Sequence, residues 1–197
     1  MKKTILIMAL TLSMYSGLLI ADTNIALQKA NDSLSVNWEK FGPVSKEVSA
    51  DYKHIAKASR GIESSINYSL KALKIDEKIL KAYDPEIARD YFIIGNAYYS
   101  HKQHRTAIFF LEKSAELREK NLGEQIDTAE VYLSLANVYE SYGEPENVLV
   151  YLKKGLKIQE KILGKDDEKT KVTRINIAYI ENKLTEEKAE QVSITIN

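Results

Sequence analysis

The chain has 197 residues, enough for one domain with a substantial core, and its 28 basic residues balance its 28 acidic ones. This balance gives no argument for nucleic acid or an anionic membrane surface as a partner, and we predict neither. The lack of cysteine excludes disulfides, thiolate metal sites and cysteine nucleophiles. With only 8 glycines and 3 prolines, the composition favours a helical globular protein.

Residues 1–21 have the pattern of a secretion signal peptide. Lys2 and Lys3 precede a mostly apolar, uncharged run from Ile5 to Ile20, and Ala21 is the best cleavage point. The run contains polar residues and falls short of the ~20 apolar residues that a membrane-spanning helix needs. We therefore expect an exported protein, periplasmic or secreted. The alternative is an uncleaved N-terminal anchor in the inner membrane, with the rest of the chain facing outward.

Residues 22–46 are predicted to form an N-terminal helical cap or linker. Their apolar residues recur at helical spacing before Gly42 and Pro43 interrupt the pattern. The stripe consists of Leu27, Ala30, Leu34 and Trp38. We expect Trp38 and Phe41 to pack onto the first repeat described below, with self-association or partner docking as the alternative role.

Three similar phrases then recur along the chain. "LKIDEKIL" begins at Leu73, "ELREKNL" at Glu116 and "LKIQEKIL" at Leu156, so that Lys74, Glu116 and Lys157 occupy the same position in successive copies. A repeat period of roughly 40 residues predicts an all-α solenoid of antiparallel helix pairs. The expected units cover about residues 47–82, 85–122 and 126–163, followed by a lone capping helix at 167–184 and a tail at 185–197.

Local signals place the ends of these helices. Asp84, Pro85 and Glu86 read as an N-cap, a first-turn proline and an acidic first turn, and Asp166 or Asp167 caps the last helix in the same way. Gly123 and Gly164 stand where second helices would end, because glycine tolerates the left-handed conformation best.

Residues 47–184 resemble the tetratricopeptide repeat family, in the long form found in kinesin light chains. A small residue recurs midway along each first helix, with an aromatic residue four positions before it and a tyrosine three positions after it in the two central units. The small residues are Gly95, Ala136 and Ala178; the aromatic residues are Tyr91, Tyr132, Tyr98 and Tyr139. The resemblance implies a right-handed solenoid, with a concave groove that binds a protein or peptide.

The first helices would line that groove. On the family pattern, the groove residues are Arg89, Phe92, Asn96, Tyr99, Glu130, Leu133, Asn137 and Glu140, with Val172, Asn176 and Tyr179 added by the last helix. Asn96 and Asn137 occupy the same place in successive units and resemble the asparagine of a carboxylate clamp, although Phe92 stands where that clamp has a lysine. These asparagines either bind the backbone of a peptide or are simply accommodated on the polar wall of the groove, and both alternatives stay open.

No catalytic, cofactor or metal site is predicted. His101 and His104 are three residues apart and could share a metal, but Lys102 and Arg105 would repel a cation, so a solvated turn is the preferred reading. The predicted function is an exported, non-enzymatic adaptor that binds an unidentified protein or peptide in the groove. The alternatives are a structural, self-associating envelope protein, or a metal-binding protein that uses the His101 and His104 turn.

Overall fold

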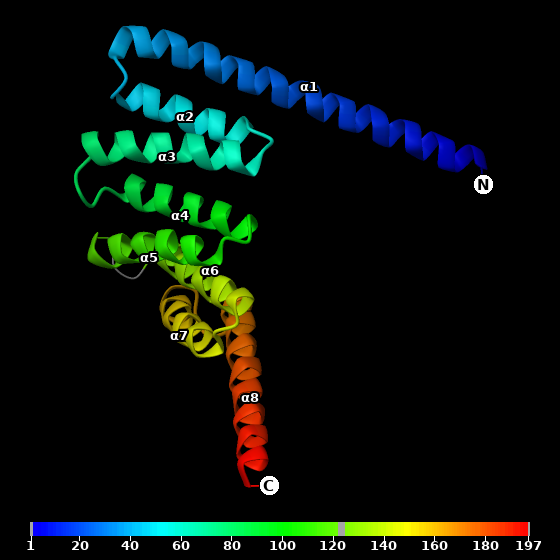
Figure 1. Cartoon of the computed structure of the whole chain (residues 1–197), viewed down its shortest axis with the longest axis vertical. Helices are drawn as coiled ribbons and strands as arrows, with labels where there is room; N and C mark the ends of the chain where they lie inside the picture. The colour runs from blue at the N-terminus through cyan, green and yellow to red at the C-terminus, as the bar shows by residue number, and fades with distance from the viewer. Residues whose placement is uncertain (1, 122–124, 197) are drawn as a thin grey trace. The chain divides into compact units, whose positions relative to one another are not determined.

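A computed structural model describes residues 2–121 and 125–196 of the chain, and all regular structure in these residues is helical (Figure 1). The helices are α1 (Lys2–Phe41), α2 (Lys46–Ala58), α3 (Ile62–Ile79), α4 (Pro85–Ser100), α5 (His104–Asn121), α6 (Ile126–Tyr142), α7 (Pro145–Ile162) and α8 (Glu168–Ile196). They divide into two compact units, Met1–Ile79 and Leu80–Asn197, which are described separately. The helix end expected at Gly123 lies outside the described residues.

In the first unit, α1 is one helix that runs through both the expected signal and the expected cap. Its stripe of Leu27, Ala30 and Leu34 is buried or half-buried, as the spacing predicts, and α1 packs against α2. Over the described residues, no helix combines the length and apolar character needed to cross a bilayer.

Polar contacts reinforce the packing of α1 on α2. Asp51 is 3% exposed, and its carboxylate accepts a hydrogen bond from Ser33 Oγ at 2.7 Å and another from Asn37 Nδ2 at 2.8 Å. The expectation that Trp38 and Phe41 pack onto the first repeat was wrong, because each is 44% exposed. Asn37 contacts α2 through Asp51, whereas the two rings stay on the surface.

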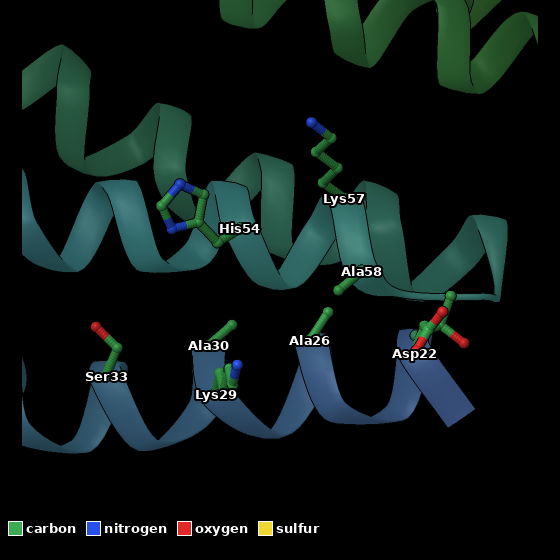
Figure 2. A pocket seen from close by; sticks show the side chains of 9 residues that line it. Asp22, Ala26, Lys29, Ala30, Ser33, His54, Lys57 and Ala58 are labelled. Atoms are coloured by element: carbon green, nitrogen blue, oxygen red, sulfur yellow. The ribbon is translucent and has the colours of Figure 1, made fainter. Parts of the chain in front are cut away.

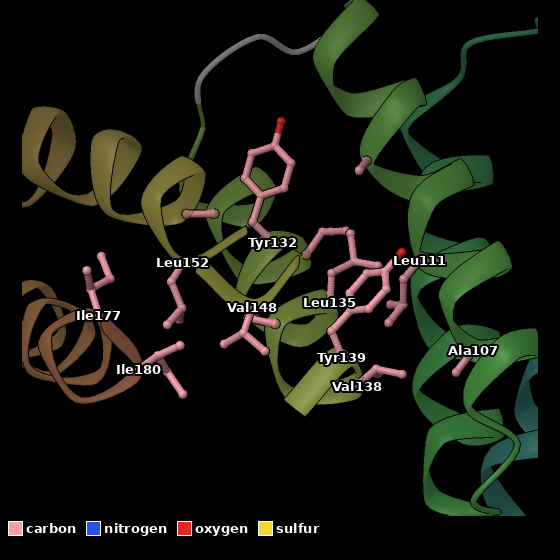
Figure 3. Packing of buried hydrophobic residues seen from close by; sticks show 14 of the residues in the cluster. Ala107, Leu111, Tyr132, Leu135, Val138, Tyr139, Val148, Leu152, Ile177 and Ile180 are labelled. Carbon is pink, nitrogen blue, oxygen red and sulfur yellow. The ribbon is translucent and has the colours of Figure 1, made fainter. Parts of the chain in front are cut away.

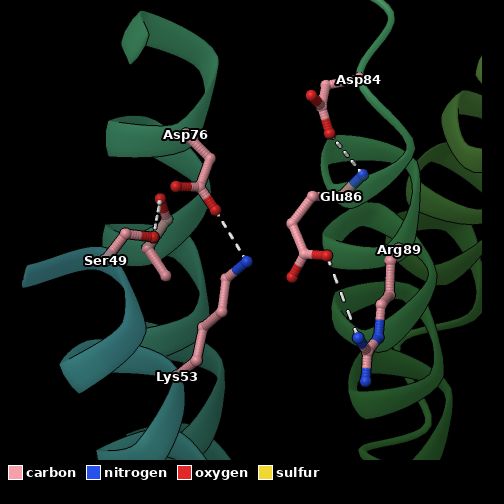
Figure 4. A network of polar contacts seen from close by, with 7 residues as sticks. Ser49, Lys53, Asp76, Asp84, Glu86 and Arg89 are labelled. Carbon is pink, nitrogen blue, oxygen red and sulfur yellow. Dashed lines mark hydrogen bonds and ion pairs between the residues drawn. The ribbon is translucent and has the colours of Figure 1, made fainter. Parts of the chain in front are cut away.

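A second buried carboxylate joins α2 to α3 (Figure 4). Lys53 Nζ lies 2.7 Å from Asp76 Oδ2, and the Asp76 side chain is 4% exposed. One turn away from Lys53, Ser49 Oγ donates to the carbonyl of Ala72 at 3.4 Å. Removing one partner of such an ion pair would leave the other charge buried without compensation, and this would destabilise the fold.

In the second unit, the helix pairs α4–α5 and α6–α7 repeat the same ring packing. Phe110 lies against Tyr91 and Tyr98, with ring centroids 5.9 and 5.3 Å away. Tyr151, at the equivalent position of the next pair, lies against Tyr132 and Tyr139 at 6.2 and 5.4 Å. Buried aliphatic residues from α5 to α8 complete one continuous core around the second pair (Figure 3).

Helices α4 and α5 approach closely at Gly95, one of the recurring small residues. A Cβ added to Gly95 would lie 2.7 Å from Leu111 Cγ and 3.1 Å from the Leu111 backbone nitrogen. At the α6–α7 crossing the tight residue is Gly155, where an added Cβ would lie 3.1 Å from Leu133 Cδ2. Leu111 is fully buried, whereas Leu133 is only half-buried. The Leu133 side chain can therefore shift away from an added Cβ more easily than the Leu111 side chain can.

This difference predicts that substitution by alanine destabilises the fold at Gly95 but not at Gly155. We expect Gly95→Ala to lower the free energy of unfolding by about 1–2 kcal/mol, because overpacking costs more than the ~1 kcal/mol gained in helix propensity. The matched variant Gly155→Ala is expected to be neutral or slightly stabilising, since the Leu133 side chain can shift. Urea unfolding of both variants measures the difference, and equal destabilisation by the two would contradict the prediction.

The helix ends confirm most of the local signals. Asp84 caps α4, with Oδ1 accepting from the Glu86 backbone nitrogen at 2.9 Å ahead of Pro85 (Figure 4). Of the two candidates at the last helix, Asp167 is the cap, because its Oδ1 accepts from the backbone nitrogens of Lys169 and Thr170. Gly164 has φ +91° just after α7, the left-handed conformation expected there.

Helix α8 differs from the predicted capping helix in length and in its faces. It continues past residue 184 to Ile196, because the Thr-Glu-Glu-Lys-Ala-Glu stretch from Thr185 contains no glycine or proline to stop it. Ala178, one of the recurring small residues, is exposed, since no second helix follows α8 in the described residues. Ile175 is 67% exposed, so the exposed surface of α8 is not polar throughout.

Burial, and then a shared carboxylate, raise two tyrosine pKa values in the second unit. Burial, and then the charge of Glu112, raises the pKa of Tyr139 to about 12 from its ordinary 10.0, and the same two causes raise the pKa of Tyr151. Both hydroxyls donate to Glu112 Oε1, at 3.2 and 3.0 Å. Folding thus favours the protonated phenols, and the stability that they contribute is complete below pH 10 and is lost as the pH rises through 12.

We therefore expect two tyrosines to ionise late in an alkaline titration followed by ultraviolet absorbance. Glu112→Gln should lower both pKa values part of the way towards 10.0, because it removes the charge but not the burial. Glu116→Gln is the control, since Glu116 pairs with Lys113 and Lys120 on the exposed surface of α5. An unchanged titration curve for Glu112→Gln would contradict the assignment.

Candidate functional site

The second unit contains a groove between α6 and α8. Helix α7 packs against both of them and forms its floor. The larger hollow has a volume of about 430 Å³, and a smaller one of about 100 Å³ shares Asn137, Leu152 and Asn176 with it. Together these hollows form the α6–α8 groove, lined by Ile126, Ala129, Glu130, Leu133, Ala136, Asn137, Glu140, Val148, Leu152, Gln159, Glu168, Lys169, Val172, Thr173, Asn176, Tyr179 and Ile180.

The structure brings together seven of the residues expected from the family pattern. They are Glu130, Leu133, Asn137 and Glu140 from α6, and Val172, Asn176 and Tyr179 from α8. Asn137 and Asn176 face one hollow from opposite walls, so an extended segment lying between them could contact both amides. Their role in binding stays a prediction.

The four residues expected on α4 lie elsewhere, and none of them lines either hollow of this groove. Phe92 packs against the core, and the Tyr99 hydroxyl is 2.9 Å from Ser141 Oγ, which ties α4 to α6. Arg89 is exposed and lies 3.9 Å from Glu86, and Asn96 is half-buried. A binding role for these residues also stays a prediction, with Phe92 and Tyr99 already engaged in packing.

The pattern missed the floor and the far end of the groove, above all Gln159. This residue belongs to the repeated phrase, which in the sequence served only to establish the repeat. Asp76, Arg118 and Gln159 occupy the same position of the phrase, and all three are buried, at 3%, 6% and 3% exposure. Other positions of the phrase also hold polar residues in every copy, so burial in the structure, and not the sequence, distinguishes this one. Buried polar groups need partners.

Those partners differ between the three copies. Asp76 pairs with Lys53, and Arg118 Nη1 lies 3.4 Å from Asp127 Oδ2 at the start of the next helix. Gln159 Oε1 is buried and has no hydrogen-bond partner among the described residues. The third copy therefore leaves a buried polar atom open where the earlier copies form ion pairs.

Carboxylates dominate the charge around the groove. Glu130, Glu140 and Glu168 line it against a single ammonium group, that of Lys169. All three carboxylates belong to exposed residues, and no ion pair joins them to the described part of the chain. The groove thus combines an apolar floor of Leu133 and Leu152 with acidic and amide rims, which suits a segment with both apolar and donor groups.

The two candidate metal-binding histidines have other contacts. His101 Nδ1 is 3.4 Å from Gln103 Nε2, and the His104 ring lies near the Tyr99 and Tyr142 rings, at 6.0 and 6.2 Å. Across the described residues, histidine, aspartate and glutamate side chains do not gather in threes as around a metal ion. A metal role for this turn stays a prediction.

The first unit has a separate hollow of about 530 Å³ between α1 and α2 (Figure 2). Ala26, Ala30 and Ala58 line its apolar part, and Lys29 and Lys57 lie at its edge. Small side chains on both helices create this space, because they cannot fill the gap between the two backbones. The lining also includes a histidine and one carboxylate, those of His54 and Asp22.

A family model described as Tetratricopeptide repeat matches residues 88–121, which span α4 and α5. The chain carries a tetratricopeptide repeat. The matched repeat holds the Gly95 crossing and the Tyr91, Phe110 and Tyr98 rings, and the following α6–α7 pair repeats its ring packing. No curated protein matches the chain significantly in sequence.

Several solved structures share the fold, and the description of one of them names TPR-like repeats. A putative kinesin light chain repeat protein from Podosopora anserina is 15% identical over 90% of this chain and 86% of its own, with a TM-score of 0.73. BtubC from P. vanneervenii is 14% identical over 83% of this chain and 65% of its own, at 0.63. A Rap protein complexed with Competence and Sporulation Factor is 17% identical over 81% of this chain and 49% of its own, with a TM-score of 0.57. At such identities the likeness establishes the fold alone.

Proposed function

We propose that this protein is an exported, non-enzymatic adaptor that binds a segment of another protein in the α6–α8 groove. The observation that carries the proposal is the groove itself, an open hollow with an apolar floor and polar walls from three helices. Its lining contains seven of the residues that the family pattern assigns to ligand binding. The Rap protein of similar fold was solved with a bound factor, which supports binding as the use of such a fold.

Co-purification from cells with matched variants tests this function. Asn137→Arg places a long cationic side chain in the groove beside the Glu140 carboxylate, and Asn137 is exposed, so the fold should tolerate it. Lys157→Glu changes charge on α7 outside the groove. We expect one partner to be enriched with the wild type and Lys157→Glu and lost with Asn137→Arg. Identical protein sets for both variants would overturn the proposal.

A second candidate, self-association, has an observation of its own. Trp38 and Phe41 of the first unit, three residues apart on α1, are each 44% exposed. Exposed apolar clusters often mark protein contacts. Light scattering of the purified protein separates the candidates. A stable oligomer abolished by Trp38→Ala, together with groove variants that leave partner enrichment unchanged, would favour self-association over the adaptor.

Export is the third part of the proposal and rests on the signal pattern of residues 1–21. Cleavage after Ala21 would remove Lys2 and Lys3 and no acidic residue, which leaves 26 basic and 28 acidic groups, a net charge of −2. Intact mass measurement of the protein from the cell envelope should give a chain that begins at Asp22. A cytoplasmic, full-length chain would contradict export, and an envelope-bound full-length chain would indicate the anchor.

A further inference from the structure

We infer that the α6–α8 groove takes a basic side chain, arginine or lysine, from the partner segment. The inference deepens the proposed function and rests on it. It comes from comparing two successive copies of the repeat. Arg118 and Asp127 form an ion pair in one copy, and in the next copy Gln159 holds the position of Arg118, while Lys169 holds that of Asp127 with Glu168 directly before it. A carboxylate is still present, one residue earlier in the sequence, and a neutral amide replaces the buried guanidinium of the chain.

The groove is open at this point. Gln159 and Glu168 line the same hollow of about 430 Å³, and Gln159 is 3% exposed with Oε1 unpartnered among the described residues. Glu168 is exposed and likewise has no ion pair within the described chain. An incoming guanidinium or ammonium group would donate to both oxygens and restore the charge pairing that Arg118 provides in the preceding copy.

Other groups around this hollow also favour a positively charged side chain from the partner. Glu130 lines this hollow from α6, and Ile126, Leu133 and Leu152 offer apolar surface for the methylene stem of a long basic side chain. Two features oppose a cation, the Lys169 ammonium and the N-terminus of α8 with about half a positive charge. Asp167 offsets the helix end with a full negative charge, since its carboxylate caps the Lys169 and Thr170 backbone nitrogens.

Two short peptides provide the probe. The blocked peptide acetyl-Leu-Ala-Arg-Ala-Leu-amide carries one guanidinium, and its counterpart carries citrulline, which has the same shape without the charge. Binding of each to the purified protein is measured by nuclear magnetic resonance from the side-chain amide signals of Asn137, Gln159 and Asn176. We expect the arginine peptide to shift these signals and to bind at least tenfold more tightly, a difference of about 1.4 kcal/mol.

Variants assign the effect to the groove. Glu168→Gln, an exposed substitution that should not disturb folding, is expected to remove most of the preference for arginine over citrulline, and Gln159→Arg should abolish it by supplying the chain's own guanidinium. Glu146→Gln, in the first turn of α7 and outside the groove, should leave it unchanged. Equal affinity of the two peptides, or no shift with either at millimolar concentration, would overturn the inference.

The inference and the proposed function fail in different ways. If a partner captured in cells is lost with Asn137→Arg but its bound segment has an acidic or neutral residue facing Glu168, the groove binds a segment and the basic side chain is wrong. If no partner depends on the groove, the adaptor function itself is wrong.

Discussion

Leu135→Ala is expected to lower the free energy of unfolding of the second unit by about 3 kcal/mol, within the roughly 2–5 kcal/mol typical of a buried leucine. Leu135 is fully buried on α6 in the core that joins α5 to α8 (Figure 3). Removing its three terminal carbons loses apolar burial and leaves a cavity, and the neighbouring rings of Tyr132 and Tyr139 are held by their own contacts with Tyr151 and cannot collapse into it.

Urea unfolding followed by far-ultraviolet circular dichroism measures this loss. Val150→Ala is the matched control on α7, since Val150 is 50% exposed and its truncation should change stability by no more than about 0.5 kcal/mol. If the two variants lost equal stability, the core would not be centred where the structure places it.

The second large effect concerns the first unit. Lys53→Met is expected to cost about 2–3 kcal/mol, somewhat below the roughly 3–5 kcal/mol of a fully buried pair, because the Lys53 side chain is 26% exposed. The variant keeps the apolar stem and leaves the Asp76 carboxylate buried without this cation. The double variant Lys53→Met/Asp76→Leu should recover most or all of the loss, since replacing a buried pair by apolar residues is often neutral or stabilising.

Fluorescence of Trp38, the single tryptophan, reports unfolding of this unit because it lies on α1. A double variant no more stable than Lys53→Met would show that Asp76 is not held by this ion pair. The burial of Asp76 would then follow from the packing of α3 against α2 alone.

The repeat period was enough to predict the fold. Phe110 and Tyr151, at equivalent positions of successive units, share the same ring packing, because the two helices of each unit pack through the same positions. The family pattern also assigned Asn137 and Asn176 to one groove, and both line the larger hollow between α6 and α8. It failed where a position's surroundings change from one copy to the next. Ala178 is exposed because no second helix follows α8 in the described residues.

The chemistry at the far end of the groove was not readable from periodicity for a related reason. Gln159 sits in a phrase of packing residues, and its importance comes from what the preceding copy does with Arg118. A pattern of apolar positions assigns the phrase to the core and passes over its one buried polar member. Only the partners in space distinguish a satisfied ion pair from an open acceptor.

In-cell crosslinking from a photoreactive residue at position 137 tests the central claim, that the α6–α8 groove holds a partner segment. The same residue at position 157, exposed on α7 outside the groove, is the control. We expect one adduct, heavier than the chain and identified by mass spectrometry as a different protein, from position 137 and not from position 157. Recovery of only uncrosslinked chain from position 137, or the same adducts from both positions, would contradict the claim.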